Sequence, residues 1–336
     1  MTLAFTPPWW AKNPHVQTIL PVMRKIPMPV VKRERLELQD GDFIDLDWLG
    51  KPEDGQPILL IVHGLEGSAQ SHYARRMLDE AKQQGLCAVV HHHRSCSGEP
   101  NRLARSYHSG DTEDVSFTLK TLKQRCPNSP LLGIGYSLGG NVLAKYQGTY
   151  REQSLLSRAV VVSAPLALGA CAKRLEGGFS TVYQSYLIKQ LQQKMRTKLE
   201  TPGLQTAMPV DHRQLANLST FYLFDDKITA PLHGFDGAED YYNRASGLSF
   251  LQHITVPTLI IHAQDDPFMT DEVIPAQHQL SSAVEYELHQ YGGHVGFING
   301  GTPWQPKFYL EHRALRFLLN GASNDSSLRG ADNAAK

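Results

Sequence analysis

Short apolar runs recur along the chain and predict strands that are covered on both faces. Each run spans four or five residues, and more polar stretches separate the runs from one another. Strands with continuous apolar sequence are typical of parallel sheets, because helices pack on both sides of such sheets. The runs cover residues 58–62, 86–90, 131–134, 159–162 and 258–261.

Helical spacing fills the intervals between these runs, at about 70–84, 111–125 and 138–149. Strands that alternate with helices predict an α/β fold with a mostly parallel, doubly wound sheet and right-handed crossovers. A last strand near 285–288 and a final helix near 306–319 complete the expected core.

A different pattern precedes the first apolar run. Residues 33–38 and 43–48 both alternate polar with apolar side chains, and Asp40-Gly41-Asp42 lies between them. Alternation on both sides of a short polar turn predicts an antiparallel hairpin with one buried face.

Residues 167–250 interrupt the strand–helix alternation. They are rich in Gln, Lys, Tyr and Leu, they show helical spacing from 183 to 199, and they contain no long apolar strand. We interpret them as a helical cap inserted over the sheet edge where ligands bind in α/β folds. The predicted division is an N-terminal arm at 1–32, a core at 33–166 and 251–320, the cap at 167–250, and a disordered tail at 321–336.

The charge balance disfavours polyanionic partners. The chain has 33 basic and 33 acidic residues among 336, so no global field attracts nucleic acid. Its four cysteines lack close pairs, which predicts reduced, mostly buried thiols in a cytoplasmic protein. The cysteines are Cys87, Cys96, Cys126 and Cys171.

The N-terminal residues do not resemble a signal peptide, because prolines, among them Pro7, Pro8, Pro14, Pro21 and Pro27, interrupt residues 1–30. No segment reaches the roughly 20 apolar residues that span a bilayer, so at most a peripheral membrane contact is expected. Trp9 and Trp10 could enter a membrane interface, but without a nearby basic cluster we favour their packing onto the domain.

Candidate chemistry begins at Gly135-Tyr136-Ser137-Leu138-Gly139, which directly follows the apolar run at 131–134. A G-x-S-x-G segment between a strand and a helix places its serine on a sharp turn above the sheet. The glycines are expected because a side chain would clash with the neighbouring strand and helix. Ser137 is therefore the predicted nucleophile.

A serine nucleophile needs a base and a group that orients the base. In α/β hydrolases the order along the chain is serine, acid, histidine. Asp265 and Asp266 follow the strand at 258–261, and His294 stands later in a glycine-rich loop. We predict His294 as the base and favour Asp266 over Asp265 as the acid.

The tetrahedral intermediate of acyl transfer also needs hydrogen-bond donors. One predicted donor is the backbone N–H of Leu138, which follows the nucleophile. The other is the N–H of Leu65 in the loop His63-Gly64-Leu65-Glu66-Gly67, after the strand at 58–62. The competing interpretation of this loop is a turn at the end of a strand.

His91-His92-His93 could suggest a metal site. Apart from Cys96, no carboxylate or thiol stands at ligand spacing, whereas structural zinc takes four ligands. We therefore predict neither a metal nor another cofactor, and interpret the three histidines as a hydrogen-bonded strand end and loop.

These motifs together resemble the α/β-hydrolase superfamily over roughly residues 33–320, and in particular its YheT-like branch, the AB hydrolase 4 family of esterases. The resemblance implies a serine hydrolase of the carboxylic-ester type, with Ser137, Asp266 and His294 at the triad positions. It also makes lipid-like esters plausible substrates. Further segments that carry it are Asn13-Pro14-His15-Val16-Gln17-Thr18, 92–101, Ser106-Tyr107-His108-Ser109-Gly110 and Gly140-Asn141.

The sequence thus predicts an esterase that acts on a small-molecule ester without a cofactor. Two alternatives remain open. The same triad could transfer the acyl group to an acceptor other than water, or the fold could serve as a non-catalytic binding protein.

Overall fold

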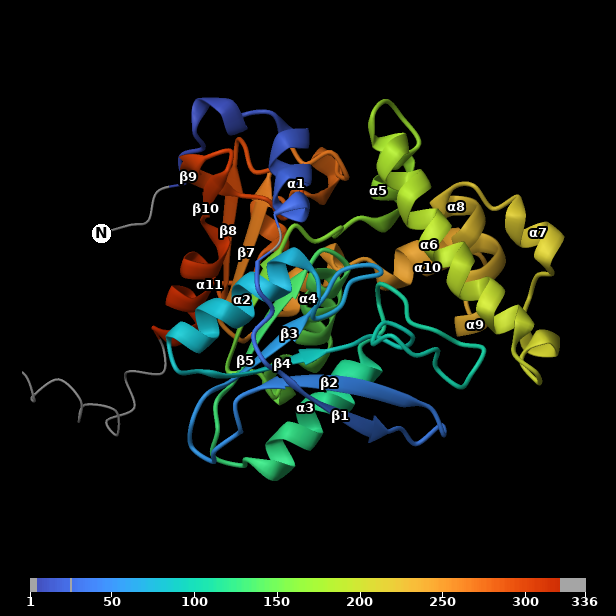
Figure 1. Ribbon diagram of the computed structural model, residues 1–336, viewed down its shortest axis with the longest axis horizontal. Coiled ribbons are helices and arrows are strands. Elements are labelled where there is room, and N and C mark those ends of the chain that lie inside the picture. The colour runs from blue at the N-terminus through green and yellow to red at the C-terminus, as the bar shows by residue number, and fades with distance from the viewer. Residues whose placement is uncertain (1–4, 25, 321–336) are drawn as a thin grey trace, which may run out of the picture.

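The computed structural model describes residues 5–24 and 26–320 (Figure 1). The tail predicted at 321–336 lies outside the described residues. The remaining chain is built around one large sheet, with helices on both of its faces and a group of helices beside it (Figure 1).

Eight strands form this sheet in the order β1-β2-β4-β3-β5-β6-β7-β8. The first two strands make the predicted antiparallel hairpin, β2 pairs antiparallel with β4, and the pairs from β4 to β8 are parallel. The predicted α/β-hydrolase sheet is therefore confirmed. The strands are β1 (Lys32–Glu37), β2 (Phe43–Leu49), β3 (Ile58–Val62), β4 (Cys87–His91), β5 (Leu131–Tyr136), β6 (Arg158–Val162), β7 (Thr258–Ala263) and β8 (Val284–His289).

Alternate residues of the central strands feed two separate cores. In β3, Leu60 and Val62 join the core beneath α3 and α4, whereas Leu59 and Ile61 join the core beneath α2 and α11. Successive side chains of a strand point to opposite faces, so a strand buried on both faces must be apolar throughout. The helices are α1 (Pro14–Met23), α2 (His72–Gln83), α3 (Glu113–Arg125), α4 (Leu138–Tyr150), α5 (Leu168–Leu175), α6 (Ser180–Glu200), α7 (His212–Ala216), α8 (Phe221–Phe224), α9 (Ala230–His233), α10 (Ala238–Ala245) and α11 (Leu310–Leu319).

The helices α5 to α10 occupy the interval predicted to form the cap and lie to the right of the sheet in Figure 1. The spacing that predicted one helix at 183–199 corresponds to α6, which has 21 residues. A small core of its own supports this group, because Ile188, Met195 and Leu215 are buried together there. The division between core and cap remains a prediction.

Two elements near the chain ends were not predicted. Helix α1 was not predicted because it contains prolines. Pro14 is nevertheless compatible with a helix, because it occupies the first turn, where no backbone N–H is needed, and Asn13 caps that turn. A two-stranded hairpin of β9 (Ile298–Thr302) and β10 (Gln305–Phe308) precedes α11. The final helix therefore begins at Leu310 and not near 306.

The prediction that the two tryptophans pack onto the domain is wrong for Trp9. This side chain is 85% exposed, whereas its neighbour Trp10 is half-buried. All four cysteines are free and buried, as expected. Among the helices of residues 5–24 and 26–320, none is long and apolar enough to cross a membrane.

Candidate active site

Ser137 stands on a sharp turn between β5 and α4. Its backbone has φ 52° and ψ −120°, outside the usual regions for a residue with a side chain. A Cβ atom on Gly135 would lie 2.4 Å from the Gly139 carbonyl oxygen, and one on Gly139 would lie 2.4 Å from the Val62 oxygen. The glycines are thus required by contact with the helix and with the neighbouring strand, as the sequence predicted.

The structure brings the three predicted triad residues together from distant parts of the chain. His294 Nε2 lies 2.9 Å from Ser137 Oγ, and His294 Nδ1 lies 2.8 Å from Asp266 Oδ2. The Asp266 side chain is buried, and its second oxygen accepts the Phe268 N–H at 2.9 Å. The Phe268 ring stacks on the imidazole with centroids 4.1 Å apart. The imidazole of His294 is therefore fixed by the contact of Nδ1 with Asp266 and by stacking on one face.

Asp265, the alternative acid, contacts the histidine loop and not the imidazole. Its Oδ1 accepts the Gly293 N–H at 2.9 Å, while its Oδ2 is buried without a partner among the described residues. Burial, reinforced by the negative charge of Asp266, raises the pKa of Asp265 to about 6. Of the two candidates, only Asp266 is in position to orient His294.

Helix α1 supports the loop that carries His294. The His294 N–H donates to Thr18 Oγ1 at 3.0 Å. A Cβ atom on Gly296 would lie 2.0 Å from the Gln17 carbonyl oxygen, whose usual helical donor is absent because residue 21 is proline. Sequence reasoning missed this role of Thr18, although Thr18 belongs to a segment that carried the family resemblance.

The loop after β3 lies against the nucleophile. A Cβ atom on Gly64 would lie 3.1 Å from Ser137 Cβ. The Gly64 N–H donates to the Tyr73 hydroxyl and the Glu66 N–H to the Tyr107 hydroxyl, each at 2.8 Å. The intervening Leu65 N–H has no acceptor among the described residues. The turn in this loop therefore leaves one donor free beside Ser137.

An ion pair between a partly exposed lysine and a buried carboxylate joins this loop to the cap. Lys194 of α6 lies 2.9 Å from Glu66 Oε2 and 3.0 Å from Cys96 Sγ. The Tyr107 hydroxyl donates to Glu66 Oε1 at 2.7 Å, and Glu66 itself has a positive φ of 54°. No motif in the sequence marked Glu66 or Lys194, because their pairing depends on how α6 crosses the sheet edge.

A largely apolar cavity of about 140 Å³ opens beside Ser137 and His294. Phe221 and Phe224 of the cap line it, whereas Met208 belongs to the cap core and Tyr222 is exposed. This aromatic segment therefore contributes both to the wall of the cavity and to the core of the cap. Most of the other lining side chains are also apolar: Leu65, Leu138, Pro165, Leu168, Ala172, Leu175, Leu187, Leu191, Met195, Ile228, Leu232, Phe268 and Met269.

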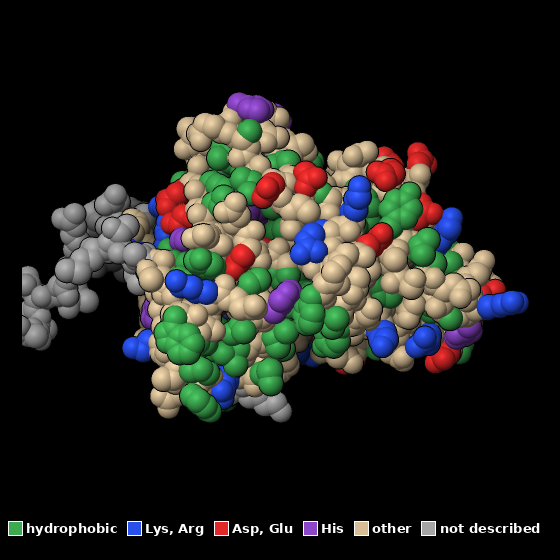
Figure 2. All heavy atoms as spheres, turned by 90° about the horizontal axis from the view of Figure 1, so that it is seen from above, with side chains coloured by type: hydrophobic (Ala, Val, Ile, Leu, Met, Phe, Trp, Pro, Cys, Tyr) green, Lys and Arg blue, Asp and Glu red, His purple; other side chains and the backbone are tan. Residues whose placement is uncertain are grey.

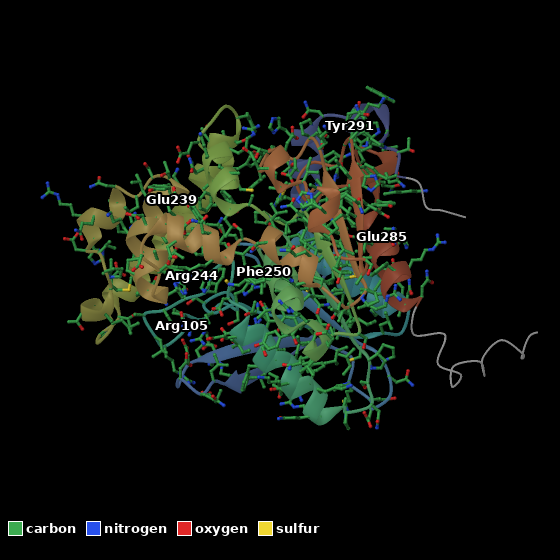
Figure 3. The ribbon with its side chains drawn as sticks, turned by 180° about the vertical axis from the view of Figure 1, so that it is seen from behind. Arg105, Glu239, Arg244, Phe250, Glu285 and Tyr291 are labelled. Carbon is green, nitrogen blue, oxygen red and sulfur yellow. The ribbon has the colours of Figure 1, made fainter. Side chains whose placement is uncertain are left out.

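One acid lines the cavity within the cap. Asp225 begins a π-helical turn, η4 (Asp225–Thr229), and accepts hydrogen bonds from Thr229 Oγ1 at 2.6 Å and Tyr242 Oη at 2.9 Å. Burial raises the pKa of Asp225 to about 6. A separate, more open cleft on the reverse side is lined by Arg105, Arg244 and Phe250 (Figure 3).

The histidines at 91–93 each have their own partner. His91 Nδ1 lies 3.0 Å from Thr118 Oγ1, and His92 Nε2 lies 2.9 Å from Asp47 Oδ2. His93 bonds to the backbone of His63, and burial lowers its pKa to about 4. Within the described residues, no three His, Cys, Asp or Glu side chains are grouped to hold a metal ion.

The sheet and the site geometry define the class of protein. The family model described as the alpha/beta hydrolase fold matches residues 57–301. The chain belongs to the α/β-hydrolase fold family and, within it, to the YheT-like branch.

Particular relatives span nearly the whole chain. It is 45% identical to “Putative esterase YheT” of Escherichia coli (strain K12) over 92% of this chain and 91% of that protein. It is 26% identical to human Phospholipase ABHD3 over 92% of this chain and 77% of that protein. The solved Pyrococcus furiosus esterase Pf2001 superposes with a TM-score of 0.55 at 15% identity, covering 87% and 91% of the two chains, a similarity of fold alone.

Proposed function

We propose that the protein is a serine esterase that uses Ser137, His294 and Asp266 as a catalytic triad. Ser137 Oγ attacks the carbonyl carbon of a carboxylic ester while His294 Nε2 takes the hydroxyl proton. Asp266 fixes the imidazole through Nδ1 and stabilises its protonated form. The Leu65 and Leu138 N–H groups bind the negatively charged oxygen of the tetrahedral intermediate.

Collapse of that intermediate breaks the ester bond. His294 returns its proton to the leaving alcohol, and the acyl group stays on Ser137. A water molecule then repeats the attack with His294 as base, which releases the acid and restores the serine. In these reaction steps, every proton is transferred between protein, substrate and water, so the proposed reaction needs no cofactor.

The observation that carries the proposal is the continuous contact from Asp266 through His294 to Ser137, at 2.8 and 2.9 Å. A serine hydroxyl is activated by an adjacent base, and the base works best when a third group orients it, so the two contacts act together. The free Leu65 N–H beside the nucleophile supports the assignment of an oxyanion donor.

A lipid-like ester is the substrate class that we propose. The apolar cavity beside Ser137 would accommodate an acyl chain and exclude water from it. The relatives named Phospholipase ABHD3 and Monoacylglycerol lipase ABHD2 support the same class. Four free, buried thiols support a cytoplasmic location.

The Ser137→Ala variant tests the proposal. Hydrolysis of p-nitrophenyl esters should fall by at least about 10³-fold, because the nucleophile is lost while the fold is kept. Thermal unfolding of the variant should match the wild type. Equal rates of hydrolysis by clean preparations of the two proteins would refute the triad.

A further inference from the structure

Helix α1 has the reverse of the usual distribution of side chains on a surface helix. It buries the polar Gln17 and Thr18 against the fold and turns Ile19, Val22 and Met23 outward. These three apolar residues are spaced at i, i+3 and i+4, so they share one face of the helix. Val22 is 61% exposed and Met23 is 71% exposed.

Two tryptophans extend the exposed apolar surface. Trp9 belongs to η1 (Trp9–Ala11), just before α1, and Trp304 lies in the turn between β9 and β10, where it is 74% exposed. We call the side chains of Trp9, Ile19, Val22, Met23 and Trp304 the N-terminal apolar face. Contiguous exposed apolar surface marks a site of interaction in a folded protein.

The elements that carry this face form one rigid unit. The Gln17 side chain donates to the Ala11 carbonyl at 2.8 Å and accepts the Ile298 N–H at 2.6 Å. Arg24 donates to the Pro303 carbonyl at 2.6 Å, next to Trp304. Helix α1, η1 and the β9–β10 hairpin are thus joined by buried hydrogen bonds and present the face together.

The chain segments that carry the face contribute charges of one sign. Neither residues 1–33 nor residues 288–310 contain an aspartate or glutamate, although the chain has 33 acids among 336 residues. The same segments supply Lys12, Arg24 and Lys307. Figure 2 shows hydrophobic side chains gathered at the lower left, with Lys and Arg beside them and no Asp or Glu among them.

We propose that the N-terminal apolar face docks onto the surface of a bilayer that contains anionic lipid. Tryptophan prefers the boundary between headgroups and acyl chains, and an apolar stripe with flanking basic residues is what an interfacial helix presents. Segments that supply Lys12, Arg24 and Lys307 and no acid fit an anionic surface better than a second copy of the same basic segments, because like charges repel across an interface.

Docking at this face would place the helix that supports the candidate active site at the bilayer surface. The same helix holds the histidine loop through the Thr18–His294 hydrogen bond and contacts the cap, where His15 Nδ1 lies 2.9 Å from the Tyr183 hydroxyl. The binding itself does not depend on the proposed esterase activity, so each can be tested without the other.

Sedimentation of the full chain with vesicles tests the docking. Vesicles of phosphatidylcholine mixed with phosphatidylglycerol should carry the wild-type protein into the pellet, and phosphatidylcholine alone should carry much less. The variant Trp9→Ser with Trp304→Ser should lose affinity for the mixed vesicles by about tenfold or more, because both interfacial anchors are gone. Lys12→Gln with Lys307→Gln should weaken the preference for phosphatidylglycerol.

The matched control removes two exposed apolar side chains elsewhere. Tyr222→Ser with Leu223→Ser, on α8, should bind the mixed vesicles like the wild type, and both serine pairs should keep the wild-type melting temperature. A wild-type protein that stays in the supernatant with both vesicles would overturn the proposal. So would equal losses in the two serine pairs, or a tryptophan-dependent dimer in lipid-free sedimentation velocity, which would assign the face to self-association.

Discussion

Asp265 and Asp266 are neighbours in the chain but have different surroundings. Asp266 contacts the imidazole of His294, whereas Asp265 contacts the backbone of Gly293. We therefore expect Asp266→Asn to lower kcat for ester hydrolysis by about 10³-fold or more, because an amide does not stabilise the protonated imidazole.

The matched variant is Asp265→Asn, which keeps the size and an oxygen acceptor for Gly293. Its kcat should remain within about tenfold of the wild type, since it acts only through the loop. Steady-state kinetics on one soluble ester compare both variants. A larger loss in Asp265→Asn than in Asp266→Asn would reverse the assignment of the triad acid.

The pKa of Asp265 also predicts a pH dependence of stability. Its pKa of about 6 in the fold exceeds the ordinary 3.8, so between these values the native protein holds a proton that the unfolded chain has lost. This group therefore makes stability decrease as pH rises from about 4 to 6. Denaturant unfolding across this range should show a smaller decrease in Asp265→Asn than in the wild type. Parallel curves for the two proteins would contradict the prediction.

Helix α6 is connected to the loop at 63–67 by the ion pair between Lys194 and Glu66. Lys194→Met would leave the buried Glu66 without its cation. Breaking such a pair costs about 1–2 kcal/mol of stability here, because Lys194 keeps some solvent contact. We expect kcat/KM to fall by about tenfold as the Leu65 N–H loses its fixed position.

Lys189 provides the control for this prediction, because it lies on the same helix but is exposed. Lys189→Met should leave both kcat/KM and the melting temperature close to the wild-type values. Indistinguishable kinetics for the two methionine variants would show that the ion pair does not position the loop.

At the level of elements, the sequence predicted helices and strands well where burial requires a regular pattern of apolar positions. The strands β3 and β5 were predicted within two residues, because both of their faces are buried and must be apolar. Helix α1 was missed because it contains prolines, whereas the β9–β10 hairpin was missed because it is held by contacts with Gln17 and Arg24, which are distant in the chain.

At the scale of the whole molecule, a buried charge network around Arg94 joins distant parts of the chain. Its guanidinium contacts both oxygens of Asp114 at 2.7 and 2.8 Å, Asp40 at 2.7 Å and Asp42 at 3.1 Å. These acids come from α3 and from the β1–β2 turn, so one side chain joins the hairpin to the core.

Arg94→Met should lower the free energy of unfolding by about 3–5 kcal/mol, because Asp42 and Asp114 would remain buried without their cation. Thermal and denaturant unfolding measure this loss. Arg102→Met is the control, since Arg102 pairs with Glu37 on the exposed surface and should change stability little. Equal stability of the two variants would contradict a structural role for the network.

At the largest scale, the order serine, acid, histidine predicted which residues would meet, because the fold brings the ends of parallel strands to one edge. The structure was needed to decide whether Asp265 or Asp266 contacts His294, since the side chains of neighbouring residues point in different directions. The pairing of Lys194 with Glu66 could not be predicted either, because the path of the cap is set by its own core.

The most direct test of the proposed triad is to locate the reactive nucleophile by chemical labelling. The purified protein is treated with a fluorophosphonate, digested, and its peptides are mapped by mass spectrometry. One adduct is expected, on Ser137, which disappears in Ser137→Ala and forms at least about 10³-fold more slowly in His294→Ala. An adduct on another residue, or a folded wild-type protein that the probe does not modify, would contradict the proposed triad.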